Sequence, residues 1–302
     1  MSFAIKDEFR CAGGKLLKVM HESKVTGTPM DVNLYLPQQY YSGSTQGKKI
    51  PSVYFLAGLT CTPNNGSEKA FWQREADRYG FAMVFPDTSP RGDAVPDDPE
   101  GGWDFGKGAG FYVNATQAPY STNFNMYQYV HSELPTALTE FFASEKRPQG
   151  LGAVDFEENV SITGHSMGGF GAVSGFLKNI NRYKSCSAFA PIVDPTTTPW
   201  GVKALTNYLG ADKAAWCEYD PCELINDVPH VPGKEILIHY GTQDQWMDPY
   251  LMPQRFMGLL SQSKWAGHID VRMVDGFDHS YYFVSTFVPE HAKFHAKHLG
   301  LL

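Results

Sequence analysis

A short apolar run that ends in a glycine-flanked serine is the feature that most limits how this chain can fold. Val160-Ser-Ile-Thr leads directly into Gly164-His-Ser-Met-Gly, and residues 167–178 continue with a helical pattern. A serine on such a strand-to-helix turn has a strained backbone, and side chains two positions to either side would clash. The first N–H groups of the helix would also point at the serine oxygen. The pattern predicts that Ser166 is a nucleophile, although a glycine turn with a capping serine is the alternative explanation.

Short apolar runs alternate with helical patterns through most of the chain. Such runs mark strands covered on both faces, and their alternation with helices indicates a mostly parallel sheet with helices on both faces. Together with the serine turn, this organisation predicts an α/β-hydrolase fold. The predicted strands are residues 52–56, 81–85, 160–163, 185–190, 235–240 and 269–274, and the predicted helices are residues 67–79, 126–144, 167–178, 252–263 and 281–298.

The first fifty residues have a different pattern, in which Gly13-Gly14 marks a hairpin between alternating segments. We therefore expect an N-terminal antiparallel meander, followed by an exposed polar loop at residues 42–49. Because we find neither a repeat nor a linker, residues 1–302 are expected to form a single α/β-hydrolase domain. The predicted strands of the meander are residues 3–10, 15–21 and 30–36.

Charge and cysteine content exclude several classes of function. The formal net charge is −7, which gives the surface no electrostatic reason to bind nucleic acid or anionic lipid. The N-terminus lacks the apolar core of a signal peptide, and no apolar run reaches membrane-spanning length. Five scattered cysteines have no metal-ligand spacing and are expected to be free thiols of a cytoplasmic protein. Neither a metal nor a cofactor is expected.

The partners of Ser166 are predicted from two late strand ends. Asp244 follows the strand at residues 235–240 through a short turn, and His279 follows the strand at residues 269–274. The order serine, acid, histidine is the one that this fold uses, and the carboxyl ends of parallel strands lie on one edge of the sheet. His279 would accept the Ser166 proton, and Asp244 would orient the imidazole and stabilise its charged form.

Other acids and histidines are weaker candidates for these roles. Asp248 precedes a proline and has the pattern of a helix N-cap, and Asp278 adjoins His279 and would point away from it. His239 lies inside a strand, and His165 is the variable residue of the serine turn. Three more histidines are expected to face solvent from the last helix, namely His291, His295 and His298.

The oxyanion donors are expected from two backbone N–H groups. Residues 57–61, Ala-Gly-Leu-Thr-Cys, follow the strand at residues 52–56 and occupy the place of the second donor loop in this fold. The predicted pair is the N–H of Leu59 and the N–H of Met167. An ordinary strand-to-helix turn is the alternative explanation of the glycine loop.

These residues together resemble the S-formylglutathione hydrolase family, also called esterase D. The likeness extends from Met30 to the last helix. One departure is Gln243, which stands where the family usually has the first of two consecutive acids. The motifs that carry the resemblance are Gly58-Leu-Thr-Cys-Thr, Gly102-Trp-Asp-Phe-Gly, Gly108-Ala-Gly-Phe-Tyr-Val, Gly164-His-Ser-Met-Gly-Gly, Pro199-Trp-Gly and Asp278-His-Ser-Tyr-Tyr-Phe.

The resemblance implies hydrolysis of a small-molecule thioester, S-formylglutathione, to glutathione and formate in formaldehyde detoxification. The family's serine, aspartate and histidine fall on Ser166, Asp244 and His279, and a homodimer is the family expectation. A general short-chain carboxylesterase with the same triad is the alternative function.

The acyl pocket is expected beside a long aromatic-rich segment, residues 87–123. Trp103 from this segment and Trp200 are the candidate pocket walls, although packing of surface loops would explain either residue as well. Cys61 lies two residues after Leu59 and is predicted to sit at or behind the pocket, with a small buried hydrophobe as the alternative.

Overall fold

The computed structural model describes residues 3–43, 47–144 and 151–302, and within them nine strands form one sheet. The strand order is β1-β2-β3-β5-β4-β6-β7-β8-β9. Strands β1, β2, β3 and β5 pair antiparallel, whereas the strands from β5 to β9 pair parallel. The bounds are β1 Phe3–Cys11, β2 Gly14–Glu22, β3 Pro29–Leu36, β4 Ser52–Leu56, β5 Ala82–Pro86, β6 Val160–His165, β7 Tyr183–Phe189, β8 Ile236–Gly241 and β9 Ile269–Val274.

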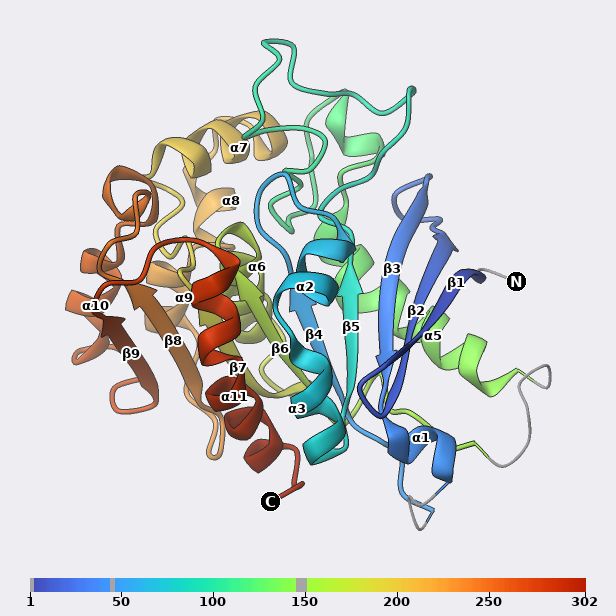
Figure 1. The fold of residues 1–302 in the computed structure, drawn as a ribbon. Helices are drawn as coiled ribbons and strands as arrows, with labels where there is room; N and C mark the ends of the chain where they lie inside the picture. Colours follow the sequence, from blue (N-terminus) through green and yellow to red (C-terminus); the bar gives the residue numbers. More distant parts are fainter. Residues whose placement is uncertain (1–2, 44–46, 145–150) are drawn as a thin grey trace.

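Helices cover both faces of this sheet, as predicted (Figure 1). Helices α2, α3 and α11 lie in front of the sheet in this view, and α5 and α6 lie behind it. The helices are α1 Gln38–Ser42, α2 Pro63–Lys69, α3 Trp72–Tyr79, α4 Met126–Gln128, α5 Leu134–Ala143, α6 Met167–Lys178, α7 Pro199–Leu209, α8 Lys213–Cys217, α9 Pro221–Asp227, α10 Pro253–Leu260 and α11 Tyr281–His298.

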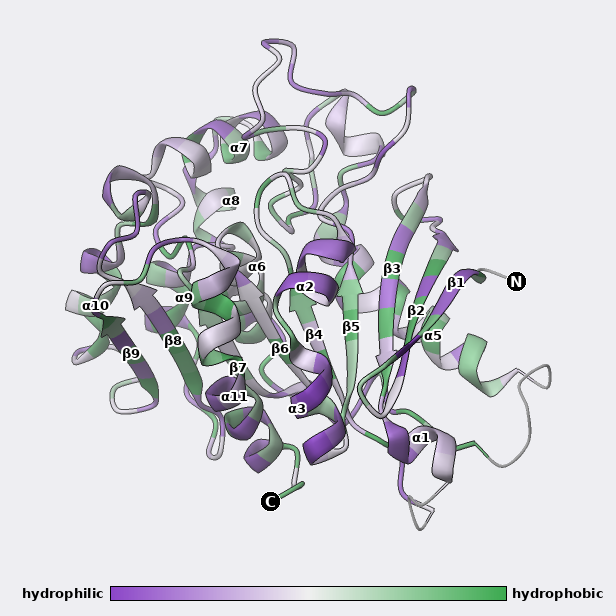
Figure 2. Cartoon of the chain, viewed as in Figure 1, coloured by the Kyte–Doolittle hydropathy of each residue, from purple (hydrophilic) through white to green (hydrophobic). Residues whose placement is uncertain are grey.

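The hydropathy of the strands follows their place in the sheet (Figure 2). Every residue of β4, β5, β6 and β8 is buried, whereas all but the two end residues of β1 are exposed. A strand with neighbours and helices on all sides contacts no water, whereas β1 at the edge of the sheet is solvated along nearly its whole length. The short apolar runs therefore correspond to the parallel centre of the sheet, as predicted, although the predicted strand at residues 269–274 is the other edge strand and has no buried residue.

Three predicted helices differ from the observed ones. Residues 67–79 form two helices because Phe71 takes a left-handed conformation with φ of 59°. The segment 126–144 contains a π-helical turn between α4 and α5. The helix predicted over residues 252–263 is shorter, since it begins at Pro253 and ends at Leu260. None of these changes moves a strand end.

The predicted loop at residues 42–49 is tested only in part. Ser42 is the last residue of α1, and residues 47–49 are exposed. Residues 44–46 lie outside the described part of the chain.

The expectation that the last helix presents its histidines to solvent is wrong. His291 and His295 are completely buried, and the side chain of His298 is only 7% exposed. Helix α11 packs on α3 and on β7 and β8, so the face that carries these histidines lies against the sheet. Serine hydroxyls and another histidine supply the hydrogen bonds that imidazoles need there, which is how polar rings become buried.

One long loop and two helices surround the carboxyl ends of the strands. The loop between β5 and α4, together with α7 and α8, lies beyond the carboxyl ends of the parallel strands (Figure 1). No helix in the described ranges has both the length and the apolar character needed to cross a membrane.

Candidate active site

The serine turn has the strained geometry that its glycines suggest. Ser166 joins β6 to α6 with φ of 59° and ψ of −121°, a conformation that L residues rarely adopt. A Cβ on Gly164 would lie 2.1 Å from the carbonyl oxygen of Gly168, and a Cβ on Gly168 would lie 2.0 Å from the carbonyl oxygen of Leu56. Only glycine fits at both positions, so the surroundings hold Ser166 in place at the start of α6.

His279 and Asp244 lie in direct contact. The Nδ1 atom of His279 is 2.6 Å from Oδ2 of Asp244, across a distance of 35 residues in sequence. The carboxylate of Asp244 is fully buried, and the side chain of His279 is 11% exposed. The other carboxylate oxygen, Oδ1, accepts a hydrogen bond of 2.8 Å from the N–H of Trp246. The buried carboxylate of Asp244 thus accepts one hydrogen bond at each oxygen. Because it occupies Nδ1 of His279, Nε2 is left to exchange a proton with a reacting group.

The two rival acids do not contact His279. Asp278 is exposed, and its Oδ1 accepts hydrogen bonds from the N–H and the hydroxyl of Ser280. The interpretation of Asp248 as a helix N-cap is wrong, because α10 begins five residues later, at Pro253. Asp248 instead has an extended backbone, with φ of −128° and ψ of 126°, as expected for a residue before proline.

The loop after β4 lies against the serine. A Cβ on Gly58 would be 3.1 Å from Cβ and 3.7 Å from Oγ of Ser166, so a side chain there would crowd the nucleophile. The loop is held by the hydroxyl of Tyr112, which donates to the carbonyl of Ala57, and by the N–H of Thr60, which donates to the carbonyl of Gly108. Leu59 therefore lies on a fixed loop beside Ser166, while Met167 is the first residue of α6.

Cys61 lies on the same loop and is 9% exposed. Burial raises the pKa of its thiol, against an opposing side-chain hydrogen bond with Tyr281. Its carbonyl accepts hydrogen bonds from the hydroxyl of Thr88 and from the guanidinium of Arg91. A protonated thiol in this position is a weak nucleophile.

Trp103 and Trp200 belong to a larger aromatic group than the sequence suggests. Their ring centroids are 5.4 Å apart, and Trp246 contacts both, at 6.0 Å from Trp103 and 5.0 Å from Trp200. Tyr250 stacks on Trp200 at 4.1 Å. Trp200 is 4% exposed and Trp103 is 49% exposed, so Trp200 is packed inside the aromatic group and Trp103 lies at its surface. Trp246 and Tyr250 were identifiable only as aromatic residues shortly after Asp244.

An ion pair fixes the loop that carries Trp103. Lys203 on α7 lies 2.7 Å from Asp98 and 2.6 Å from Asp104, on either side of the tryptophan in sequence. The pairing keeps the pKa of Asp98 below its usual value. The position of Trp103 is therefore set by α7, the helix that also carries Trp200.

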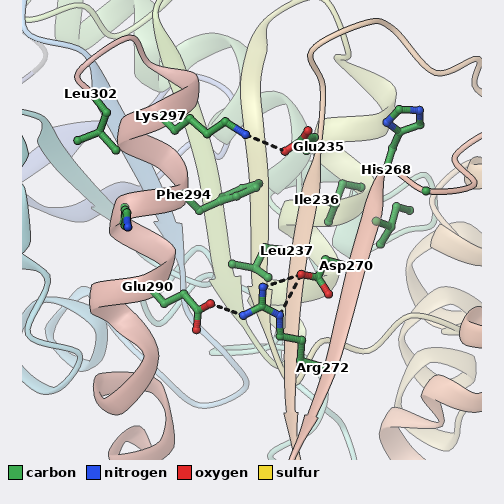
Figure 3. Close-up of a pocket in the computed structure, with 13 residues that line it drawn as sticks. Glu235, Ile236, Leu237, His268, Asp270, Arg272, Glu290, Phe294, Lys297 and Leu302 are labelled. Carbon is green, nitrogen blue, oxygen red and sulfur yellow. Dashed lines mark hydrogen bonds and ion pairs between the residues drawn. The ribbon is translucent and has the colours of Figure 1, made fainter.

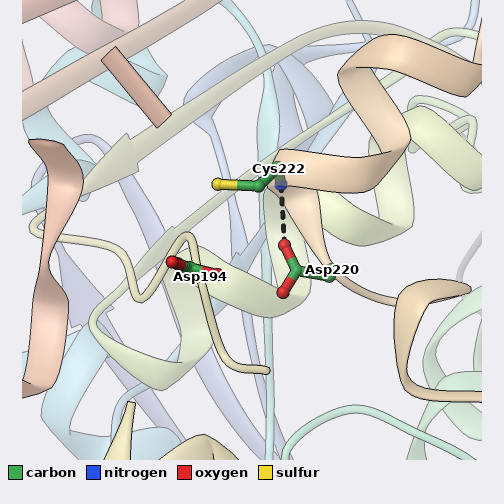
Figure 4. Close-up of side chains that lie close together, drawn as sticks. All are labelled: Asp194, Asp220 and Cys222. Atoms are coloured by element: carbon green, nitrogen blue, oxygen red, sulfur yellow. Dashed lines mark hydrogen bonds between the residues drawn. The ribbon is translucent and has the colours of Figure 1, made fainter. Parts of the chain in front are cut away.

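One group of side chains has metal-ligand types but is already satisfied (Figure 4). Asp194, Asp220 and Cys222 are buried together. Asp194 is bound by Arg255 at 2.7 Å, and Asp220 caps α9 by accepting from the N–H of Cys222 at 2.8 Å. Because a guanidinium already supplies the positive charge, this group is explained as a structural ion pair and helix cap.

A cavity of about 580 Å³ lies between α11 and the strands β8 and β9, of which β9 is at the edge of the sheet (Figure 3). Glu235 and His268, which line it, precede these strands, whereas Asp244 and His279 follow them. The cavity is thus at the opposite end of the strands from Ser166. Its charged residues are mostly paired with one another, as in Glu235 with Lys297 and Arg272 with Glu290.

The chain is similar to known esterases in sequence and in structure. Residues 23–294 match the Esterase family, described as "Putative esterase". The chain is 55% identical to the S-formylglutathione hydrolase of Saccharomyces cerevisiae, over 98% of this chain and 98% of that one. It is 41% identical to the S-formylglutathione hydrolase of Paracoccus denitrificans, over 99% of each chain. A solved S-formylglutathione hydrolase from Agrobacterium tumefaciens superposes with a TM-score of 0.86 at 41% identity, covering 98% of this chain and 99% of that one.

The two lines of similarity agree over nearly the whole length, and the solved structure carries the same mostly parallel architecture. The predicted α/β-hydrolase fold and the resemblance based on motifs are therefore confirmed. This chain belongs to the S-formylglutathione hydrolase family of esterases.

Proposed function

We propose that the protein hydrolyses S-formylglutathione to glutathione and formate, with Ser166, His279 and Asp244 as its catalytic residues. The observation that carries the proposal is the contact between His279 and Asp244 at 2.6 Å, on the same edge of the sheet as the strained Ser166 turn. Relatives of that name at 55% and 41% identity support the choice of substrate.

The first half of the reaction forms an acyl enzyme. The Oγ atom of Ser166 attacks the thioester carbonyl carbon while its proton passes to Nε2 of His279. Asp244 holds the proton on Nδ1 and stabilises the resulting imidazolium. The N–H groups of Leu59 and Met167 would donate to the oxyanion. The C–S bond then breaks, the proton on His279 passes to the departing sulfur, and formyl-Ser166 remains.

The second half returns the enzyme to its starting state. His279 accepts a proton from water as the water oxygen attacks the formyl carbon, and a second oxyanion forms in the same place. The bond to Ser166 breaks, its oxygen recovers the proton from His279, and formic acid leaves and releases its proton to the solvent as formate. Because thiolate is a good leaving group, the enzyme mainly has to position the nucleophile and stabilise the oxyanion.

The aromatic group and Cys61 are proposed to border the substrate. A formyl group is very small, so the buried Trp200 and the Gly58 loop would leave enough room for it, while the exposed rim of Trp103 would contact the peptide part of glutathione. Trp246 connects the aromatic group to the proposed triad. Its backbone N–H donates to Asp244, and its ring contacts both Trp103 and Trp200.

The test is release of thiol from purified protein supplied with S-formylglutathione. We expect thiol to appear in step with formate, and a kcat/KM well above that for a short-chain aryl ester. The Ser166→Ala variant is the matched control and should release none above background. A preference for the aryl ester would contradict the proposed substrate and favour a general carboxylesterase.

Three further expectations concern the whole protein. One sheet containing all nine described strands supports a single domain over residues 1–302. Five free cysteines support a reducing compartment, the cytoplasm. A homodimer rests on the family resemblance alone. Light scattering of the purified protein tests the dimer, and a monomer at micromolar concentration would contradict it.

A further inference from the structure

His165, the residue before the serine, lies against the face of His279. The two imidazole centroids are 4.5 Å apart, with 39° between the ring planes. On another side, Tyr281 meets His165 edge-on at 5.3 Å. His165 itself is 4% exposed. The residue at the variable position of the turn is thus enclosed between His279 and the first residue of α11.

Hydrogen bonding accounts for little of the presence of a histidine in this place. Both ring nitrogens of His165 are buried, and neither makes a hydrogen bond of ordinary geometry with a described residue, apart from a weak interaction with the backbone of His279. Most buried polar groups are fully paired, so a ring with so little hydrogen bonding has another reason to be there. What the ring does supply is a tilted aromatic contact with His279.

His279 needs such a contact because its hydrogen bond to Asp244 constrains it incompletely. One bond at Nδ1 fixes the distance to the carboxylate but allows the ring to tilt about the line of that bond. A tilt would move Nε2 away from Oγ of Ser166. A planar neighbour packed on the ring face removes this freedom, and aromatic faces also attract a nearby cation such as the imidazolium formed during turnover.

The neighbour can do this only if it stays uncharged. Burial first, and the charge of His279 second, hold the pKa of His165 well below its usual value, against a weaker backbone interaction with His279. A charged ring at this distance would repel the imidazolium instead of stabilising it.

We propose that His165 is a positioning residue, whose neutral ring holds the imidazole of His279 in the plane needed to accept the Ser166 proton. The proposal rests on the proposed serine-hydrolase function. It assigns to His165 no contact with substrate and no proton transfer of its own.

The test compares His165→Leu, which removes the flat ring, with His165→Phe, which keeps it. The Leu variant should lose about ten- to a hundredfold in kcat with KM within about twofold, since a misplacement of about 1 Å has effects of this size. The Phe variant should recover most of the loss. His131→Leu is the matched control, because His131 is also buried with an unpaired ring nitrogen and makes a tilted ring contact with Tyr127. This control should keep its kcat.

A second measurement keeps the proposal testable if the His165→Leu variant does not fold. The rate at which a fluorophosphonate labels Ser166 depends on the same proton transfer and requires no thioester. The folded Phe variant should be labelled at a rate near that of the wild type. A Leu variant with wild-type kcat, a Phe variant as slow as the Leu variant, or a loss confined to KM would overturn the proposal.

The labelling assay also distinguishes a failure of the role proposed for His165 from a failure of the proposed substrate. If wild-type protein reacts with the fluorophosphonate but releases no thiol from S-formylglutathione, the proposed substrate fails. The labelling rates of the Leu and Phe variants then still decide the role of His165.

Discussion

Two groups of buried histidines lie at different places on the sheet, and only one is organised for proton transfer. At the carboxyl ends of the strands, His279 bonds to the fully buried Asp244 and keeps some contact with solvent. Under α11, His291 bonds to His239 at 2.9 Å, and His295 lies between the hydroxyls of Ser185 and Ser187 at 2.8 Å from each, with no exposure at all for His291 or His295.

The contrast shows that burial alone does not make a histidine a base. Burial lowers the pKa of His295 to about 3 and that of His291 well below its usual range, so both rings stay neutral. They have neither a carboxylate to stabilise the cation nor access for a substrate. A catalytic imidazole needs a buried acid on one nitrogen and an open path to the other. The following predictions test this distinction.

The largest effect is expected from removing Ser166, the proposed nucleophile, whose proton His279 would accept. Ser166→Ala should lower kcat by about five to six orders of magnitude, as loss of a nucleophile does in related triads, while the fold stays intact. Steady-state kinetics and the thermal unfolding temperature measure the two parts. A variant with more than a small fraction of wild-type kcat would show that another residue is the nucleophile.

His279→Ala should be nearly as damaging, and Asp244→Asn somewhat less, by about four orders of magnitude. The amide of asparagine permits the wrong imidazole tautomer.

Steady-state kinetics of both variants, with the thermal unfolding temperature as the control for folding, check this prediction. A folded His279→Ala variant that keeps more than a small fraction of the wild-type kcat would contradict the assignment of His279.

Modification of Cys61 should have an intermediate effect. A bulky adduct on this buried thiol would displace the Gly58 loop, which lies against Ser166, and should reduce the rate by about a hundredfold. The measurement is residual activity after treatment with a thiol reagent. Cys61→Ser is the control: it should be active and resistant. Inactivation of that variant at the wild-type rate would identify a different cysteine as the one responsible.

The smallest effect on turnover is expected from the second histidine group. His295→Leu should leave kcat near the wild-type value at pH 8. It should reduce the free energy of unfolding by about 1–3 kcal/mol, since two buried hydrogen bonds are lost. Ser185 and Ser187 retain partners in Ser161 and Thr163. If His295→Leu lost much of its kcat while keeping normal stability, the second group of histidines would not be purely structural.

The second group also makes stability depend on pH. A histidine with a lowered pKa is neutral in the folded state, whereas the unfolded chain takes up its proton near pH 6.5. Unfolding therefore binds protons below that pH, so the stability that these rings provide is present above about pH 6.5 and falls on acidification towards pH 3. The slope is about 1.4 kcal/mol per pH unit for each ring. Urea unfolding at pH 8, 6.5 and 5 should show a shallower dependence for His295→Leu than for the wild type.

The sequence by itself determines all nine described strands to within two residues at each end, and both ends of two helices. Strands Ser52–Leu56 and Ile269–Val274 and helices Met167–Lys178 and Tyr281–His298 have the ends that their patterns predict. These ends depend on local causes: apolar runs, glycine turns and the periodicity of helices. The strained serine turn is local for the same reason, because its glycines lie within two residues of Ser166.

Only the tertiary structure decides which side chains meet. The sequence already favours Asp244 over Asp248 and Asp278, but the contact of Asp244 with His279 joins loops after two different strands. The addition of Trp246 and Tyr250 to the aromatic group, and of His165 to the surroundings of His279, likewise depends on segments far apart in the chain. Helix α11 is predicted with the right ends but the wrong buried face, because periodicity describes a helix and not the surface on which it packs. That surface is β7 and β8, whose serines and histidine make a buried polar face possible.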